Sequence, residues 1–508
     1  MKYATWTIVA LVTLMRGLAA WKVPLTGDEA YYWEWAKHLA LGYADHPPMV
    51  AYLILPFDWV TANPLWIRLA FLGCGVVATL AAAATAQRLT GDERAGMVTA
   101  LAMTLAPMLS VGFVIATPDG PLMAGWALCL YLTVRASQTH AKRDYVLLGV
   151  AIAFTLLSKM FAYALVAGIV AWSLAPSRRG LWREGLGWSF GVAAVLYAPF
   201  VVWNATHDWI TFVFAFQQRH ASQPMLLRPL VYLAANAGAY SPGLWLAALL
   251  VLVRPRNALI AWTSIPLSVL LILLNLHERI ELHWIFGPYV SLCVGMGVAF
   301  ESLSHRARVL WATAGAVPAA VLIPFLFLAA AFPGPLYEQF RATGSSLRND
   351  GPFEIFTYWP LAQDVRRMAD ANDAVVVTDG YGFSSQMDYE AGIPPVVIGY
   401  AKQGQEARHW YDAEMKPRRI LFVDKEALVP IPGQPKTYPG RSDFDRRLHL
   451  ACGEVKPGPD LEYSYTDPTG HSVPARTYFL TWCDDPRPDA IRILRWEDSA
   501  PSRTAASS

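Results

Sequence analysis

Charged residues are scarce in this chain: Asp, Glu, Lys and Arg make up 16% of its 508 residues, whereas ordinary soluble domains contain about 25%. Cysteine is also rare, with five residues, and no CxxC or other compact zinc-binding spacing occurs. No internal repeat is visible, although repeated halves are frequent in transporters. These absences exclude an ordinary soluble protein and give no sign of a structural zinc site.

The chain contains many long apolar runs, and 55% of its residues are hydrophobic. Each run is long enough to cross a bilayer core of about 30 Å. We expect a polytopic α-helical membrane protein with about eleven spans. These lie near residues 4–21, 64–87, 95–115, 121–135, 145–158, 160–175, 185–203, 230–252, 258–275, 284–301 and 309–332. The first run is kept as a span because Arg16 interrupts it and the later spans make a cleaved signal peptide unnecessary.

Lys and Arg gather in alternate connections between these spans, which places those connections on the cytoplasmic side by the positive-inside rule. The other connections then face outward. They include the loop at 22–63, "TPDG" at 117–120, Lys159 and "HERIELHW" at 277–284. Because the number of spans is odd, the C-terminal segment is also expected outside.

The composition changes after residue 332. Pro, Gly, Asp and Arg increase, and short β-rich runs such as "AVVVTDG", "PPVVIGY", "RRILFV" and "RTYFLTW" follow. We expect a transmembrane domain at 1–332, an extracytoplasmic soluble α/β domain at 333–500 and a disordered tail at 501–508. An oxidising compartment would permit a disulfide between Cys452 and Cys483 in this domain.

Ionisable residues collect on the outward side. "GDEAYYWEWAKHLALGYADHPP" at 27–48 predicts a surface helix that continues to Tyr43, with a second surface helix after the prolines. Arg16 and Arg68 lie within spans just below the same surface, where charged side chains are costly and mark functional sites. The remaining members of this set are Asp28, Glu29, Asp45, His46, Asp119, Lys159, Arg279 and His283.

Each of these residues also has a purely structural interpretation. Asp28 and Asp119 could be helix N-caps. Arg16 and Arg68 could extend to the interface. Lys159 could be an interfacial anchor, and His283 could belong to an aromatic belt. Their convergence on one side favours a functional site.

The loop sequence "DEAYYWEWAKHLALGYADHPPMVAYLI" strongly resembles the first outer loop of the GT-C membrane glycosyltransferases, of the protein-mannosyltransferase-like and aminoarabinose lipid A transferase-like kinds. "TPDGPL", "LLSKMFAYAL", "PFVVWNATHDWITFVFAFQQRH" and "HWIFGPY" resemble later landmarks in the same order. The resemblance covers roughly residues 1–330. One departure is Asp45-His46-Pro47-Pro48, where the lipid A transferases have Glu-Lys-Pro-Pro.

The resemblance implies inverting transfer of a sugar from a polyprenyl phosphate donor to a lipid, glycan or protein acceptor at the periplasmic face of a bacterial inner membrane. It maps the family's key acid to Asp28 and a second acid to Asp119. Because the acceptor needs a base near its nucleophilic atom, we expect Asp28 to be the catalytic base, with Asp119 as the second candidate. The substrate-binding residues expected are Glu29, Arg16, Asp45, His46, Arg68, Lys159, Arg279 and His283. Cations beside the leaving phosphate would stabilise the charge that develops in the transition state.

Other hypotheses stay open at this stage. Asp45 and His283 could hold a divalent metal ion, although two ligands are few for such a site. A transporter or flippase of a lipid-linked glycan is the main alternative function. An assembly protein with a degenerate membrane part is a third. Membrane lipids are expected partners and nucleic acids are not.

Overall fold

The computed structural model describes residues 2–58, 63–215, 226–278, 280–300, 302–311, 313, 315, 317–331, 354–378, 380–397, 410, 417–425, 441–466, 470 and 472–495. The chain forms two compact units: the first comprises Met1–Val23 and Leu39–Leu328, and the second comprises Pro24–His38 and Ala329–Ser508. The predicted domain boundary after residue 332 and the predicted tail at 501–508 lie outside the described residues. A segment of the first polar loop therefore belongs to the same unit as the C-terminal domain.

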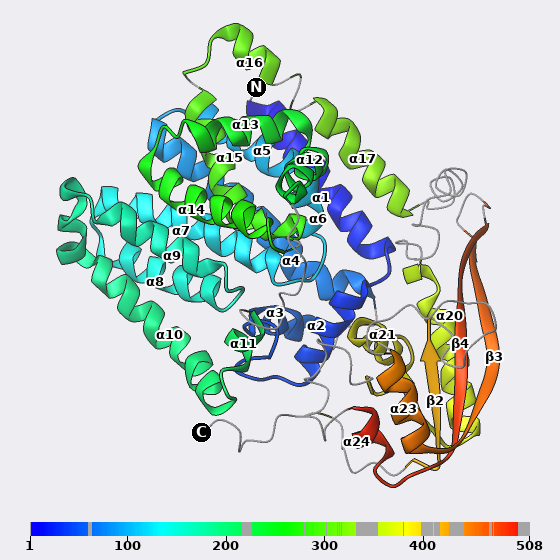
Figure 1. The fold of residues 1–508 in the computed structure, drawn as a ribbon. Coiled ribbons are helices and arrows are strands. Elements are labelled where there is room, and N and C mark those ends of the chain that lie inside the picture. The colour runs from blue at the N-terminus through cyan, green and yellow to red at the C-terminus, as the bar shows by residue number, and fades with distance from the viewer. Residues whose placement is uncertain are drawn as a thin grey trace. The chain divides into compact units, whose positions relative to one another are not determined.

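The first unit is helical, and a helix occupies the position of every predicted span. In it α4 packs against α7, α7 against α8, and α8 against α10 (Figure 1). Its helices are α1 (Lys2–Lys22), α3 (Met49–Asp58), α4 (Pro64–Thr90), α5 (Glu93–Leu105), α6 (Pro107–Gly112), α7 (Asp119–Thr139), α8 (Lys142–Leu156), α9 (Ala162–Ser173), η1 (Pro176–Arg178), η2 (Trp182–Leu186), α10 (Gly187–Thr206), α11 (Ile210–Val213), α12 (Arg228–Tyr240), α13 (Pro242–Val253), α14 (Ala258–Leu274), η4 (Leu282–Ile285), α15 (Phe286–Phe300), α16 (His305–Trp311) and α17 (Val317–Ala331).

Four helices in the described part of the chain are long and apolar enough to cross a bilayer: Tyr3–Lys22, Pro64–Thr90, Trp182–Thr206 and Leu282–Phe300. A fifth is added if α13 and α14, which meet at a bend of 108°, count as one span. Two predicted spans are interrupted. Pro107 begins a new helix within 95–115, and Pro242 does so within 230–252, because proline lacks the N–H that would continue the preceding helix.

Large apolar side chains cover the outside of several helices of the first unit. Val195 of α10, Leu250 of α13 and Leu14 of α1 are all more than half exposed. A water-soluble protein rarely exposes contiguous apolar surface of this kind. The exposed apolar faces fit contact with lipid.

The predicted surface helix is shorter than expected. The helix α2 covers Gly27–Lys37 and ends at His38, whose φ of −120° and ψ of 64° are not helical. Residues 39–48 form an irregular loop, so the predicted continuation to Tyr43 is wrong. A helix is present at the position of the second predicted surface helix, as α3.

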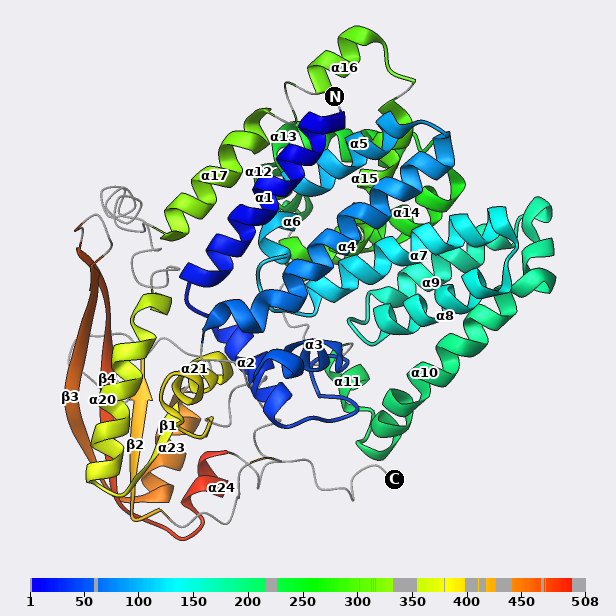
Figure 2. The same cartoon turned by 180° about the vertical axis from the view of Figure 1, so that it is seen from behind.

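The second unit is built around a four-stranded sheet of order β1-β2-β4-β3, from β1 (Ala374–Thr378), β2 (Arg419–Asp424), β3 (Cys452–Thr466) and β4 (Ser472–Pro486) (Figure 2). β1 pairs with β2 in parallel, and the other two pairings are antiparallel. The helices of this unit are α2, η6 (Glu354–Phe356), α20 (Tyr358–Ala371), α21 (Tyr381–Ala391), α23 (Arg441–Ala451) and α24 (Ala490–Leu494).

Alternate residues of the central strands face opposite sides of this sheet, as strand geometry requires. Leu421 and Val423 of β2 join a core with residues of α20 and α21, whereas Ile420 and Phe422 join a core with residues of α23 and α24. Cys452 and Cys483 form a disulfide on the second side, with Cα atoms 5.4 Å apart. The domain is therefore an α/β layer structure with two apolar cores.

Candidate active site

The loop after α2 is held by one internal hydrogen bond and by two hydrogen bonds from neighbouring helices. The Ala40 N–H donates to the Tyr43 hydroxyl at 3.0 Å, and the Tyr52 hydroxyl of α3 donates to the Ala40 carbonyl at 2.9 Å. The Thr211 hydroxyl of α11 donates to the Tyr43 carbonyl at 2.7 Å. Gly42 lies under Trp203 of α10, where a Cβ atom would approach the indole ring to 2.4 Å. A larger residue at position 42 would displace the loop.

This fixed loop carries Asp45 and His46, which are 3% and 6% exposed. The chain then enters α3, where the Met49 N–H donates to the Leu157 carbonyl at 3.0 Å. That bond joins the start of α3 to the connection between α8 and α9. The same connection carries Lys159, so the loop and the lysine are brought to one place.

Lys159 makes an ion pair with Asp119. Its Nζ lies 2.7 Å from Asp119 Oδ1, and both residues are at most 5% exposed. Asp119 is the first residue of α7 and makes no capping bond with its side chain, so the N-cap interpretation is not needed. The His283 Nε2 in η4 lies 3.9 Å from Asp119 Oδ2. Three predicted site residues from three separate segments therefore meet.

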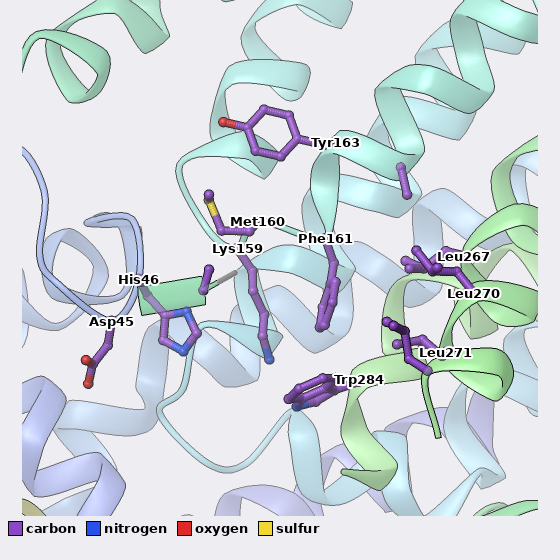
Figure 3. A pocket seen from close by; sticks show the side chains of 13 residues that line it. Asp45, His46, Lys159, Met160, Phe161, Tyr163, Leu267, Leu270, Leu271 and Trp284 are labelled. Carbon is purple, nitrogen blue, oxygen red and sulfur yellow. The ribbon is translucent and has the colours of Figure 1, made fainter. Parts of the chain in front are cut away.

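A cavity of about 260 Å³ lies beside this ion pair (Figure 3). Its polar lining comes from Asp45, His46 and Lys159, and Lys159 lies between His46 and Phe161 in Figure 3. The rest of the wall is mainly apolar: Met160, Phe161, Tyr163, Ala164, Ala215, Leu267, Leu270, Leu271, Leu274 and Trp284. A cavity with an ionic end and a wall rich in leucine suits an amphiphile with a charged head and a hydrocarbon tail.

Asp28 and Glu29 begin α2 in the second unit and differ in environment. Glu29 is fully buried and forms a capping box with Thr26: its Oε2 accepts from the Thr26 N–H at 2.9 Å, and the Glu29 N–H donates to Thr26 Oγ1. The N-cap is thus Thr26, not Asp28. Asp28 is exposed, and its Oδ1 accepts a hydrogen bond of 2.6 Å from the Tyr381 hydroxyl.

Arg16 and Arg68 are buried in the first unit but do not line the cavity. The Arg16 guanidinium donates to the Thr104 carbonyl at 3.1 Å and to Ser110 Oγ at 2.8 Å. The Arg68 guanidinium donates to the carbonyls of Ala20 and Val23 at the end of α1. Both arginines connect helices, so they do not extend to the interface as the structural alternative supposed.

Arg279 lies outside the described residues. The predicted metal ligands Asp45 and His283 do not belong to a larger ligand cluster, because the described residues contain no group of three or more His, Cys, Asp or Glu side chains that could hold a metal. His283 is directed to Asp119, which already pairs with a lysine. A metal ion held by Asp45 and His283 therefore stays a prediction.

Sequence comparison relates the chain to glycosyltransferases. The profile of the dolichyl-phosphate-mannose-protein mannosyltransferase family matches residues 45–203, which include Asp45, Asp119 and Lys159. The lipid A galacturonosyltransferase RgtD of Rhizobium johnstonii is 27% identical over 298 residues, or 55% of this chain. The match spans 63% of that relative's length.

Structural comparison covers nearly the whole chain. ArnT from Cupriavidus metallidurans in the apo state superimposes with a TM-score of 0.59 at 15% identity, over 95% of this chain and 98% of that one. The same protein bound to undecaprenyl phosphate gives a TM-score of 0.59 at 16% identity, over 94% and 97% of the two chains. The resemblance to GT-C glycosyltransferases is confirmed. The match to ArnT covers residues of both the helical unit and the unit with the C-terminal sheet.

Two features of the region around Asp28 are not predicted from the sequence. Thr26 and Glu29 fit the Ser/Thr-x-x-Glu spacing of a capping box, so the start of α2 could have been read from the sequence. Tyr381 carries no comparable signal, because it lies 353 residues from Asp28 and its contact depends on tertiary structure.

Proposed function

We propose that this chain is a glycosyltransferase that moves a sugar from a polyprenyl phosphate donor to a lipid or glycan acceptor outside the cytoplasm. The observation that carries the proposal is the cavity that joins Lys159 and His46 to a leucine-rich wall. A protein acceptor is the remaining acceptor class, since the matching family profile is that of protein mannosyltransferases.

The donor matches this cavity in charge and polarity. Its phosphate diester carries one negative charge, which the Lys159 ammonium would bind, and its prenyl chain would lie along Leu267, Leu270 and Leu271. When the sugar–oxygen bond breaks, the phosphate gains a second charge. Lys159 therefore binds the transition state more strongly than the bound donor, which is the condition for catalysis.

The chemical step is a direct displacement. A hydroxyl of the acceptor attacks the anomeric carbon, the bond from that carbon to the phosphate oxygen breaks, and polyprenyl phosphate leaves with the electron pair. Asp28 takes the proton of the hydroxyl. The configuration at the anomeric carbon is inverted because the nucleophile enters opposite the leaving group. In this scheme Asp119 orients the Lys159 ammonium through the ion pair at 2.7 Å.

The name of one relative suggests which sugar and which acceptor to test first. The galacturonosyltransferase of Rhizobium johnstonii acts on lipid A by its name, so a galacturonosyl donor and lipid A are the first pair to test. His46 stands where the aminoarabinose lipid A transferases have a lysine, which makes a difference in sugar or acceptor from those proteins a further expectation.

Two features support the outward orientation of the second unit. Lys and Arg gather in the connections on the opposite side of the predicted spans. The second unit contains the disulfide between Cys452 and Cys483, and such bonds persist in oxidising compartments such as the periplasm.

The test is transfer by the purified protein. Polyprenyl phosphate sugars would be mixed with lipid A, glycan and peptide acceptors, and products would be followed by mass spectrometry with the anomeric configuration read by NMR. We expect an inverted product and loss of transfer in Asp28→Asn, but not in Asp208→Asn, an exposed control in the first unit. Near-normal turnover of Asp28→Asn would remove Asp28 from the role of base. Movement of the intact donor across a bilayer without transfer would favour the flippase alternative.

A further inference from the structure

The C-terminal domain holds the first helix of the polar loop along its whole length. Near the start of α2, the Gln386 side chain of α21 donates to the Leu25 carbonyl at 2.6 Å. Near its end, Lys37 pairs with Asp388 of α21, and the Trp33 ring packs edge-on against Tyr389 with centroids 5.2 Å apart. The contacts fix both the rotation and the position of α2 on α21.

The backbones approach most closely beside Asp28. A Cβ atom on Gly27 would lie 3.1 Å from the Cα of Gly382, and one on Gly382 would lie 3.1 Å from the Cα of Gly27. Neither position offers room for a side chain without displacement. This contact brings the first turn of α21 against the first turn of α2.

At this point the Tyr381 hydroxyl donates a hydrogen bond of 2.6 Å to Asp28 Oδ1. The Tyr381 ring is itself held by an edge-on contact with Tyr31, one turn along α2, with centroids 4.8 Å apart. Among the described residues, Asp28 Oδ1 has this one partner and Oδ2 has none. The carboxylate is thus restrained through one oxygen while the other can accept a proton.

We propose that Tyr381 is a positioning residue that orients the Asp28 carboxylate for proton transfer, so that the C-terminal domain contributes directly to the reaction. The inference rests on the proposed function, because it needs Asp28 as the base. A base must be held in a narrow range of distance and direction from the proton it removes. An exposed aspartate alone has several rotamers, and the tyrosine selects one of them.

The matched variants are Tyr381→Phe and Tyr389→Phe. Both keep the aromatic ring in the contact between α2 and α21, but only Tyr381→Phe removes the donor to Asp28. Transfer would be measured with the full-length protein, and turnover would be normalised to the amount of undecaprenyl phosphate bound. A hydrogen bond to a charged group is worth about a ten- to hundredfold factor in rate. We expect kcat to fall by that factor in Tyr381→Phe, with KM for donor and acceptor within about twofold of wild type.

A second measurement separates positioning from a general loss of structure. In an Asp28→Glu background the carboxylate extends one methylene further, so the bond from Tyr381 no longer fixes it in the same place. Tyr381→Phe should then lower kcat by a smaller factor than it does beside the native aspartate, because the two residues act together. If Tyr381 had only a structural role, Tyr381→Phe would lower kcat by the same factor with and without Asp28→Glu. It would also lower the melting temperature.

The results distinguish the inference from the function on which it rests. If the wild-type protein transfers sugar and the normalised kcat of Tyr381→Phe is within twofold of the wild-type value, the role of Tyr381 is overturned. The proposed glycosyltransferase function is then unaffected. An equal loss in Tyr389→Phe would also overturn it. Failure of the wild-type protein to transfer any sugar would overturn the proposed function and this inference with it.

Discussion

Lys159 and Asp119 form a buried ion pair of 2.7 Å between the connection after α8 and the first residue of α7. A single buried charge is costly, so each partner stabilises the other in its charged form. The pair also presents the ammonium at the polar end of the cavity. In the proposed function this ammonium binds the phosphate of the donor.

Lys159→Met should therefore lower transfer at least about a hundredfold, since it removes the cation that meets the leaving phosphate. It should also destabilise the protein by about 3–5 kcal/mol, because Asp119 is left buried and uncompensated. The double variant Asp119→Asn with Lys159→Met should recover stability but not transfer. Turnover and thermal unfolding of the detergent-purified protein measure both effects. Lys142→Met, at the exposed start of α8, is the control, and an equal loss there would contradict the account.

Leu270 and Leu273 provide a matched test of the apolar wall. They lie on α14 and are 49% and 54% exposed, but only Leu270 lines the cavity. Leu270→Trp should raise KM for the polyprenyl donor about tenfold with little change in kcat, because the larger ring occupies space for the hydrocarbon chain. Leu273→Trp should leave both constants unchanged. Equal kinetics for the two variants would mean that the prenyl chain binds elsewhere.

Ser177 and Asp208 test the orientation across the membrane. They flank the apolar helix Trp182–Thr206 at its two ends, and both are exposed. The three free cysteines are buried, so a single introduced cysteine can be labelled selectively. A membrane-impermeant maleimide added to intact spheroplasts should label Asp208→Cys and should label Ser177→Cys only after lysis. The reverse pattern would place the C-terminal domain in the cytoplasm.

Glu390 of α21 gives the second unit a pH-dependent stability. Burial raises the pKa of its carboxyl group from 4.5 to about 7. The folded state therefore holds a proton that the unfolded state has lost, and stability falls as the pH rises through this interval. The melting temperature should decrease from pH 5 to pH 7.5, and Glu390→Gln should reduce the decrease. Glu462→Gln, an exposed control on β3, should keep it; the account of Glu390 is wrong if both variants behave like wild type.

The sequence predicts the membrane helices because a long apolar run forms few structures other than a helix that spans the bilayer. It does not locate the breaks inside them, where Pro107 and Pro242 decide the geometry. The sequence does not predict β3, because "KPGPD" at 456–460 is atypical of a strand. Proline is tolerated there because β3 lies at the edge of the sheet and has a register shift between Pro457 and Asp460.

For charged residues of the candidate site, the sequence indicates which side chains matter but not what they contact. Asp119, Lys159 and His283 were each selected from the sequence, but their meeting depends on how α7, the connection after α8 and η4 pack. Arg16 and Arg68 were selected by the same rule, although their guanidinium groups bond to backbone carbonyls between helices. A charge within an apolar run indicates that a partner exists, and only the fold shows whether that partner is a ligand or another helix.

The most direct test of the central claim is the amount of polyprenyl phosphate released for each glycosylated acceptor. Purified protein would receive a polyprenyl phosphate sugar in one reaction and the corresponding nucleotide sugar in another. We predict one polyprenyl phosphate per product in the first reaction and no product in the second. Product formed from the nucleotide sugar alone, or no product from any polyprenyl phosphate sugar, would contradict the claim.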